Sequence, residues 1–327
     1  MKIAIVKLSA MGDIIHAMVA LEFIKKKYPD AIIEWIVEKS FSGILQNNPH
    51  IDTILPLELK KIKQDKKEIL KQITLVKKYA KNNYDIIIDA QGLIKSALVA
   101  RMLKSKNSTL YGFSKKSIRE GIASYFYDKK IEITYDENTI ERNVAVLTRP
   151  FSLNVTSQDI QDKQPFLYFT SQEKIPPSPY NIFVIGSTWE SRNYPKEKFT
   201  QIANTLKIQT YVVWGNEEEK QKAVWIEQNS PYVKIAPKGN LDRLKQLISN
   251  ATLLIGNDTG PTHIAWGTNT PSITIFGPTP TNRVYLTSIN KVIKSASTIN
   301  HFKLNKNDFS IRDIDPYEIV KIAKDLL

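Results

Sequence analysis

The sequence contains no cysteine and only four histidines among its 327 residues. Disulfides and thiolate metal sites are therefore excluded, and the scattered histidines lack the spacing of metal ligands. Long hydrophobic runs are also missing, because no stretch approaches the ~18 uninterrupted apolar residues of a membrane-spanning helix. Charge and glycine interrupt the first apolar run, so we expect no secretory signal peptide. These absences favour a cytoplasmic protein with an ordinary hydrophobic core.

A three-glycine dinucleotide fingerprint is missing as well. The segment KLSAMGDIIHAM, residues 7–18, follows the apolar run IAIV and has the strand–loop–helix order of a nucleotide-binding fold. It holds a single glycine, Gly12, and places a carboxylate, Asp13, at the expected helix start. Neither half of the chain shows GxGxxG, which disfavours an NAD-dependent oxidoreductase.

Acidic residues are in the minority. The chain has 46 Lys and Arg against 33 Asp and Glu, a formal net charge of +13. Residues 1–150 hold 26 of these basic residues against 17 acidic ones, and residues 151–327 hold 20 against 16. This balance favours an anionic partner, which would be nucleic acid, a membrane surface or a phosphorylated substrate. A lysine-rich proteome explains the global excess equally well.

Both halves alternate short apolar runs with helical periods. The pattern predicts two α/β domains, each a doubly wound parallel sheet with helices on both faces. The strands are expected at 3–6, 32–37, 54–57, 85–89 and 109–113, and then at 181–186, 210–215, 252–258 and 272–277. Helices are expected over about 12–27 and in the C-terminal DPYEIVKIAKDLL. Proline-rich and polar segments place the join around 150–178.

Ligands of such sheets bind beyond the carboxyl ends of the strands, so the loops after strands are the candidate sites. In GNDTGPTHIAW, residues 256–266, Thr259 or Gly260 caps a helix and Pro261 suits its first turn. The free N–H groups and positive end of that helix suit a diphosphate. Asp258 would repel phosphate, so we expect it to hold sugar hydroxyls or to orient the loop. The alternative is a capped helix that binds nothing.

A second loop, GSTWESRNYPKEKF at 186–199, has the same strand–loop–helix order. Ser187 and Thr188 offer hydroxyl groups, and Arg192 and Lys196 add cations that neutralise phosphates. In WGNEEEK, residues 214–220, a carboxylate placed after a strand suits the hydroxyls of a ribose. Solvated helix caps and surface charges are the alternative for both loops.

The first half carries basic loops of its own. From Lys60 to Lys81 the chain has nine lysines and two acidic residues, with a helical apolar seam. Basic residues also follow the next two predicted strands, in DAQGLIKSA and GFSKKSIRE. Loops after parallel strands converge on one edge of the sheet, which favours a polyanionic substrate. A solvated helix is the alternative for the lysine run, and its single aromatic residue, Tyr79, argues against nucleic acid.

Four segments together resemble the lipopolysaccharide heptosyltransferases of glycosyltransferase family 9. They are KLSAMGDIIHAM, DAQGLIKSA, GSTWESRNYP and NDTGPTHIAWGTNTPSITIFGPT, and they span nearly the whole chain in the expected order. The SxMGD form of the first segment resembles the branch that adds the first L-glycero-D-manno-heptose to Kdo-lipid A. The resemblance implies a GT-B fold, in which two Rossmann-like domains face a central cleft.

The resemblance also implies an inverting transfer from ADP-heptose that needs no metal and no cofactor. Residues 1–155 would bind the acceptor and 176–313 the donor, with 156–175 as linker and the helix at 314–327 packed back on the first domain. Asp13 would be the general base. With the loops above, the donor-site residues are Ser187, Thr188, Arg192, Lys196, Glu218, Asp258, Thr259, Gly260 and His263. The acceptor-site residues are Lys7, Lys60, Lys61, Lys95 and Arg119.

The residue chemistry agrees with this assignment. An inverting transfer needs one base to take the proton of the acceptor hydroxyl. The departing ADP needs cations or helix N–H groups, and the sequence has no DxD-like acidic pair placed to hold a metal. The alternative role for Asp13 is a helix N-cap. The two roles combine poorly, because a capped carboxylate has a depressed pKa.

Two other functions stay open. One is a related transferase that acts at a later core position or uses another sugar donor, and the other is a non-catalytic nucleotide-binding protein. A lipid acceptor implies a protein peripheral to the cytoplasmic face of the inner membrane, where the basic half would meet anionic lipid. No nucleic acid partner is expected.

Overall fold

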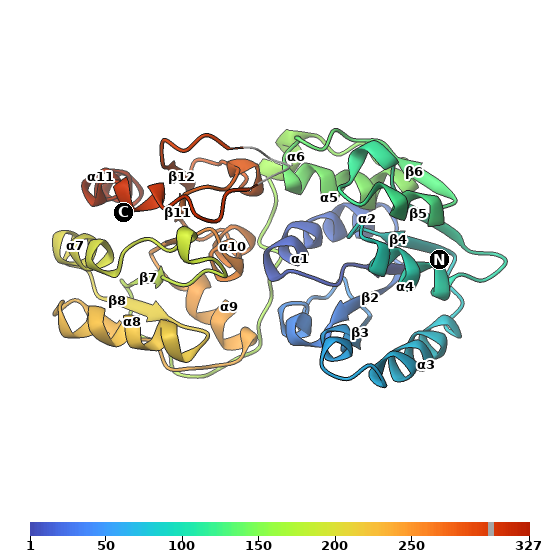
Figure 1. Ribbon diagram of the computed structural model, residues 1–327, viewed down its shortest axis with the longest axis horizontal. Coiled ribbons are helices and arrows are strands. Elements are labelled where there is room, and N and C mark those ends of the chain that lie inside the picture. Colours follow the sequence, from blue (N-terminus) through green and yellow to red (C-terminus); the bar gives the residue numbers. More distant parts are fainter. Residues whose placement is uncertain (300–303) are drawn as a thin grey trace. The chain divides into compact units, whose positions relative to one another are not determined.

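Two parallel sheets organise the chain, one in each of the units Met1–Phe166 and Leu167–Leu327 (Figure 1). The computed structural model describes residues 1–299 and 304–327. Within these residues each sheet has six strands. The predicted pair of doubly wound α/β domains is confirmed, whereas the cleft between them stays a prediction.

The first sheet has the strand order β3-β2-β1-β4-β5-β6, all parallel. Ile5 of β1 lies between Trp35 of β2 and Ile88 of β4, and all three side chains are buried. Strands of a parallel sheet are continuous apolar runs because both faces of the sheet are covered. The strands are β1 (Lys2–Val6), β2 (Ile32–Glu38), β3 (Thr53–Leu57), β4 (Ile86–Asp89), β5 (Thr109–Phe113) and β6 (Lys129–Ile131).

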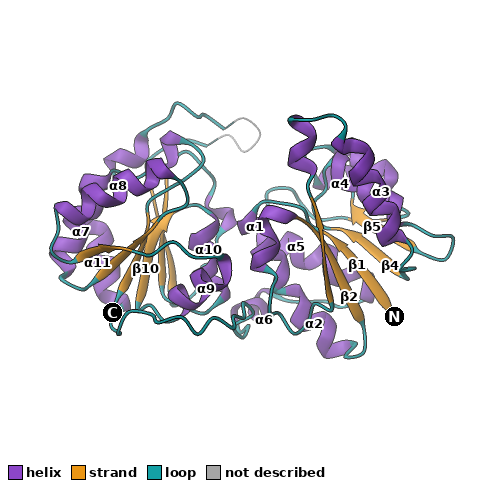
Figure 2. Cartoon of the chain, turned by 90° about the horizontal axis from the view of Figure 1, so that it is seen from below, coloured by secondary structure: helices purple, strands orange, loops and turns teal. Residues whose placement is uncertain are grey.

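Helices cover both faces of this sheet (Figure 2). The helices α1 (Met11–Met18), α2 (Ala20–Lys27) and α5 (Thr139–Thr148) pack together, as do α3 (Glu68–Ala80) and α4 (Ile94–Leu103). The single helix expected over 12–27 is thus two. The short elements are η1 (Lys39–Ile44), η2 (Leu59–Lys63), η3 (Lys115–Ser117), η4 (Gly121–Phe126), η5 (Arg149–Phe151) and α6 (Ser157–Gln161).

The second sheet repeats this plan in the order β12-β11-β10-β7-β8-β9. Its strands are β7 (Asn181–Val184), β8 (Thr210–Val213), β9 (Val233–Ile235), β10 (Leu253–Asn257), β11 (Ser272–Phe276) and β12 (Asn290–Lys294). Its helices are α7 (Lys196–Leu206), α8 (Glu217–Gln228), α9 (Leu241–Ser249), α10 (Gly260–Gly267) and α11 (Pro316–Leu326), with short turns η6 (Glu190–Arg192), η7 (Thr281–Arg283) and η8 (Ser310–Asp313).

In each sheet the strand order reverses between two central neighbours, β1 and β4 in the first and β10 and β7 in the second. Ligands of doubly wound sheets bind beyond the carboxyl ends of the strands at this switch. The loops after β1 and β4, and those after β7 and β10, are therefore the places to look for a site.

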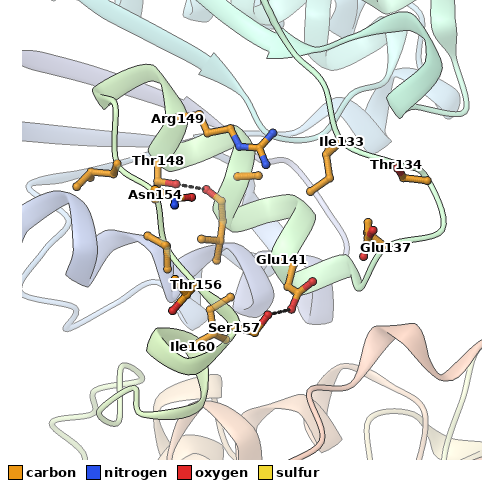
Figure 3. Close-up of a pocket in the computed structure, with 14 residues that line it drawn as sticks. Ile133, Thr134, Glu137, Glu141, Thr148, Arg149, Asn154, Thr156, Ser157 and Ile160 are labelled. Atoms are coloured by element: carbon orange, nitrogen blue, oxygen red, sulfur yellow. Dashed lines mark hydrogen bonds between the residues drawn. The ribbon is translucent and has the colours of Figure 1, made fainter.

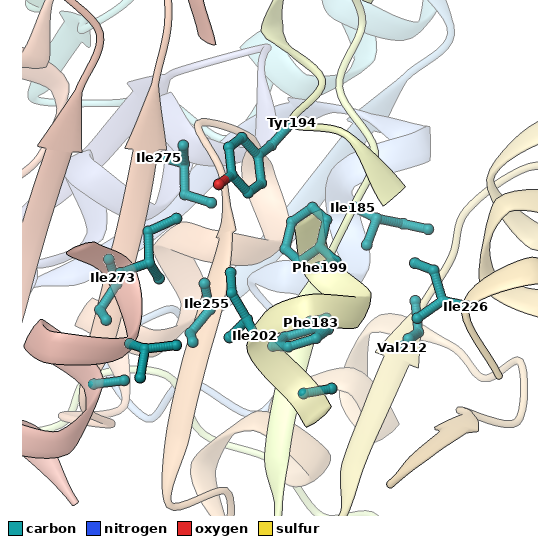
Figure 4. Packing of buried hydrophobic residues seen from close by; sticks show 14 of the residues in the cluster. Phe183, Ile185, Tyr194, Phe199, Ile202, Val212, Ile226, Ile255, Ile273 and Ile275 are labelled. Carbon is teal, nitrogen blue, oxygen red and sulfur yellow. The ribbon is translucent and has the colours of Figure 1, made fainter. Parts of the chain in front are cut away.

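The C-terminal helix corrects one prediction. We expected residues 314–327 to pack on the first domain, but α11 packs on α7 and β11 of the second unit. Its Ile319, Val320 and Ala323 belong to the buried cluster that contains Phe199 and Ile273 (Figure 4). The apolar face of a helix predicts that the helix packs against a core. It does not predict which of the two sheets that core belongs to.

The predicted linker, 156–175, begins with the short helix α6. Thr156 caps α6, whose Ile160 is buried, and the division between the units falls after Phe166. Beyond it, the backbone N–H groups of Thr170 and Ser171 donate to the Asp242 carboxylate of α9 at 3.0 and 2.9 Å. The second half of this segment therefore belongs to the second unit.

No helix in the described ranges is both long and apolar enough to span a bilayer.

Candidate active site

Asp13 lies at the carboxyl end of β1, on the first turn of α1. Ala10, which has no side chain to cap with, is the N-cap residue, and Asp13 is the third residue of the helix. Its Oδ2 accepts one hydrogen bond, from the Ala10 N–H at 3.3 Å, and the side chain is half-buried. Asp13 is therefore not the N-cap, and its carboxylate retains acceptor capacity for a ligand.

Two basic residues, Lys7 and Arg142, interact electrostatically with Asp13. The buried Lys7 ammonium donates to the Ala90 carbonyl at 2.7 Å and to Asn143 Oδ1 at 2.8 Å. Burial lowers the pKa of Lys7, and the Asp13 and Asp89 carboxylates oppose that shift. Lys7 thus joins β1, β4 and α5, and the predicted direct contact with an acceptor stays a prediction.

Arg142 of α5 is a neighbour of Asp13 that sequence reasoning missed. Burial lowers the pKa of its guanidinium, while electrostatic interactions with Tyr135 and with the Asp13 and Asp136 carboxylates oppose that shift. The guanidinium lies 4.6 Å from the Tyr135 ring centre and donates to the Ser117 carbonyl at 2.5 Å. No sequence motif pointed to Arg142 or Asn143, because both lie within a helix and the candidate residues were sought in loops after strands.

A buried carboxylate, Asp89, holds the loop after β4 in place. Its oxygens accept hydrogen bonds from Ser96 Oγ at 2.9 Å, Tyr127 OH at 2.8 Å and the backbone N–H groups of Gln91 and Gly92 at 2.9 and 3.2 Å. Burial raises the pKa of Asp89, and these hydrogen bonds oppose the rise. The network orients the start of α4, where Lys95 is exposed to solvent.

The remaining predicted acceptor residues follow β3 and β5. Lys60 Nζ donates to Ser40 Oγ at 3.2 Å and lies 4.3 Å from the Phe41 ring centre, and Lys61 pairs with Glu58 at 2.9 Å. Arg119 is exposed after η3. Three strands separate β3 from β5, which puts their ends about 19 Å apart at the usual strand spacing. One small anion cannot contact both loops, so the predicted set suits an extended substrate.

In the second unit, Asp258 directly follows β10 and contacts basic side chains. Arg192 Nη2 donates to Asp258 Oδ2 at 2.5 Å and also to the Asp258 carbonyl, and His263 Nε2 lies 3.3 Å from Oδ1. Burial alone would raise the pKa of Asp258. The His263 hydrogen bond and the positive charges of Arg192 and Arg283 outweigh it and hold that pKa below its usual range. Asp258 therefore orients the loop, one of the two roles expected for it.

The N-terminus of α10 is open beside this pair. Thr259 is the N-cap residue with no side-chain cap, and Gly260 and Pro261 begin the helix. In the loop after β7, Ser187 Oγ is buried with no hydrogen-bond partner among the described residues, and Thr188 is exposed. Because Arg192 neutralises Asp258, the carboxylate no longer repels an anion from these N–H and hydroxyl groups.

Glu219, rather than the predicted Glu218, lies against the loop after β7. Its carboxylate accepts hydrogen bonds from the Gly215 N–H at 2.7 Å and Asn216 Nδ2 at 3.0 Å, and any side chain added at Gly186 would collide with it. Glu218 instead pairs with Lys222 at 2.7 Å on the surface. Choosing between adjacent acids required the geometry of the Asn216 cap.

Lys196 begins α7 and its ammonium lies 4.5 Å from the Trp225 ring centre. It lines a pocket of about 400 Å³ with Tyr194, Lys222 and Arg312. A second pocket, of about 420 Å³, lies along α5 in the first unit, where Ser157 donates to Glu141 at 2.7 Å (Figure 3). That pocket contains none of the predicted site residues.

No group of three or more His, Asp or Glu side chains in residues 1–299 and 304–327 is arranged to hold a metal ion.

Comparisons with known proteins extend this description. The model of glycosyltransferase family 9 (heptosyltransferase) matches residues 73–310. The lipopolysaccharide heptosyltransferase 1 of Campylobacter coli is 37% identical over 348 residues, covering 100% of this chain and 99% of that protein. The lipopolysaccharide heptosyltransferase 1 of Escherichia coli K12 is 26% identical, with 93% and 97% covered.

Among solved structures, E. coli heptosyltransferase WaaC with ADP-2-deoxy-2-fluoro heptose has a TM-score of 0.82 at 21% identity and covers 100% of both chains. At that identity the likeness shows a shared fold, which is the predicted GT-B fold with its two α/β domains. With the family match and the full-length relative, it makes this chain an enzyme that transfers a sugar. The chain belongs to glycosyltransferase family 9, the heptosyltransferases.

Proposed function

We propose that the protein transfers L-glycero-D-manno-heptose from ADP-heptose to the Kdo of Kdo-lipid A, with inversion and without a metal. The observation that carries this proposal is the full-length likeness to the C. coli lipopolysaccharide heptosyltransferase 1, at 37% identity. The solved structure of WaaC with an ADP-heptose analogue supports the choice of donor. The first unit would bind the acceptor and the second the donor.

The donor half of the reaction needs a place for a diphosphate. The open N-terminus of α10, at Thr259 and Gly260, offers N–H groups at the positive end of a helix. Ser187 and Thr188 after β7 would add hydroxyl donors. Glu219, held over Gly186, is our choice for the ribose hydroxyls, in place of Glu218.

The leaving ADP takes the electron pair of the bond between its phosphate oxygen and the anomeric carbon. Arg192, His263 and Lys196 would offset the charge that develops there. Arg192 also holds Asp258 at 2.5 Å. Arg192 would therefore reduce the repulsion between the Asp258 carboxylate and a phosphate. It would also hold the loop after β10 in place.

The acceptor half requires one base. Asp13 Oδ would take the proton of a Kdo hydroxyl as that oxygen forms its bond to the anomeric carbon. Within the described part of the chain, Asp13 accepts one hydrogen bond, a long one of 3.3 Å. Lys60, Lys61, Lys95 and Arg119 would bind the carboxylate and phosphate groups of the acceptor, with Lys7 holding the loops around Asp13.

The proposed acceptor is a lipid, so the protein would work at the cytoplasmic face of the inner membrane as a peripheral protein. The excess of 26 basic over 17 acidic residues in positions 1–150 favours contact with anionic lipid. We propose no nucleic acid partner.

A panel of nucleotide sugars tests the donor. The purified enzyme is incubated with a Kdo-lipid A acceptor and with ADP-heptose, ADP-glucose or UDP-sugars, and nucleotide release is measured. We expect release only with ADP-heptose. Release with another donor would support the second candidate, a family member with a different sugar, since full-length family membership holds for both.

A further inference from the structure

Exposed apolar side chains gather where α4 packs on η4. Ile94 and Leu98 of α4 are 37% and 46% exposed, and Ile122 and Tyr125 of η4 are 62% and 68% exposed. The two elements contact each other, and the Glu120 carboxylate just before η4 accepts a hydrogen bond from the Ile94 N–H at 2.8 Å. These four side chains form one patch, the α4–η4 surface. Exposed apolar side chains that cluster on neighbouring elements are typical of interaction sites.

Cations surround the aromatic part of this surface. Lys115 Nζ lies 3.5 Å from the Tyr125 hydroxyl, and the ammonium groups of Lys115 and Lys130 lie 5.8 and 5.9 Å from its ring centre. Lys116 and Lys129 are exposed nearby in sequence. The acid closest in sequence to these lysines, Asp128, is engaged by Lys104 at 3.4 Å and Arg101 at 3.9 Å, toward the other end of α4.

We propose that the α4–η4 surface enters the interfacial layer of an anionic membrane. Aliphatic side chains and a tyrosine partition into the boundary between head groups and acyl chains, where tyrosine is enriched. Lysine stems reach along such a surface and place their ammonium groups among lipid phosphates. The α4–η4 surface combines the apolar and tyrosine side chains with adjacent lysines.

The position of the surface fits the proposed function, on which this inference rests in part. α4 begins at Ile94, five residues beyond the end of β4, so its N-terminus lies at the carboxyl edge of the first sheet. The same edge carries Asp13 and the basic loops proposed for the acceptor. A membrane bound at the α4–η4 surface would therefore hold a lipid-anchored acceptor near these residues.

A surface that binds a protein partner or a second copy of the chain would be expected to have a different amino-acid composition. Lysine is depleted in protein–protein interfaces, whose buried cores favour aromatic residues, Met and Arg. Here two lysines lie against the only exposed aromatic side chain of the four. Charge complementarity thus favours an anionic lipid surface.

Vesicle flotation tests the proposal with the full chain. The vesicles are pure phosphatidylcholine or equal parts phosphatidylcholine and phosphatidylglycerol. Ile122→Asp is the test variant and Leu286→Asp the matched control, because Leu286 of the second unit is also 62% exposed and the charge change is the same. We expect the wild type and Leu286→Asp to bind the anionic vesicles, and Ile122→Asp to bind them about tenfold more weakly. A Lys115→Ser/Lys130→Ser variant should weaken binding and reduce its salt dependence.

Three results would overturn the inference. They are equal binding by Ile122→Asp and wild type, equal loss in Ile122→Asp and Leu286→Asp, and a wild-type dimer that Ile122→Asp dissociates. Turnover of ADP-heptose on a deacylated, soluble Kdo acceptor is measured in parallel and should be unchanged in Ile122→Asp. If the wild type lacks that turnover, the proposed function fails, while the flotation result still decides the membrane surface.

Discussion

Arg192 and Asp258 form a buried ion pair at the point where the second sheet reverses its strand order. Arg192 Nη2 lies 2.5 Å from Asp258 Oδ2, and the two side chains are 11% and 3% exposed. The pair connects the loop after β7 to the loop after β10, so the two halves of the proposed diphosphate site depend on one contact. A buried charge without its partner is costly, whereas removing both charges costs much less.

This pair predicts a distinctive pattern of stability and binding. Arg192→Met should lower the free energy of unfolding by about 3 kcal/mol, because it leaves the Asp258 carboxylate buried with less compensation. Arg192→Met/Asp258→Asn should recover most of that stability, yet both variants should bind ADP weakly. Chemical denaturation and calorimetric ADP titration measure the two effects. A double variant that is no more stable than Arg192→Met would contradict the account.

Glu218 and Glu219, neighbouring acids in the first turn of α8, should behave differently. Glu219→Gln removes the charge over Gly186 while keeping an oxygen for the Gly215 N–H, so the helix cap should survive. ADP-heptose affinity should fall about tenfold, the loss expected for a hydrogen bond to a charged group. Glu218→Gln is the matched control, since Glu218 pairs with Lys222 on the surface, and the affinity of this variant should stay near wild type. The reverse ranking would restore Glu218 as the donor residue.

Lys163 predicts a pH dependence of stability. Burial lowers the pKa of this lysine to about 7, and the Glu22 carboxylate opposes the shift. The unfolded chain would hold the proton up to about pH 10.4, so the penalty for burying Lys163 is complete below the folded pKa and fades as pH rises. Lys163→Met should therefore raise the melting temperature more at about pH 6 than at about pH 9.5.

The control for Lys163 is Lys66→Met, because Lys66 is exposed and should give no such pH dependence. Equal stabilisation by Lys163→Met at both pH values would show that the lysine is not charged and buried in the way its pKa indicates.

Asp13 should be essential for turnover and dispensable for the fold. Asp13→Asn keeps an oxygen to accept the Ala10 N–H, whose distance of 3.3 Å marks a weak contact. We expect turnover to fall by about a hundredfold or more, as for loss of a general base, with little change in melting temperature or ADP affinity. Near-normal turnover would remove Asp13 from the mechanism and return it to a structural role in α1.

The sequence predicted the central strands of both sheets but missed three edge strands. The central strands are continuous apolar runs and were found, whereas β6, β9 and β12 were missed. All three are edge strands, and lysines interrupt their short apolar patterns, as in KKI and NKVIK. The fold class needed only the buried strands and the alternation with helices.

The site was predictable only where a residue follows a strand. Ser187 and Asp258 lie in such loops, Asp13 lies on the first turn of the helix that follows one, and the fold brings each to a carboxyl edge. Arg142 lies within α5, and its closeness to Asp13 depends on packing between elements far apart in sequence. Glu218 and Glu219 are adjacent in sequence but point in directions about 100° apart on a helix, which a motif cannot resolve.

The central claim is the transfer of heptose from ADP-heptose to Kdo-lipid A, and the structure of the product tests it most directly. The enzyme is incubated with both substrates in the presence of a metal chelator, and the product is examined by mass spectrometry and NMR. The account predicts one heptose on Kdo, one ADP released per transfer, and an anomeric configuration opposite to that of the donor. A product with retained configuration, a requirement for added metal, or no transfer to Kdo-lipid A would contradict it.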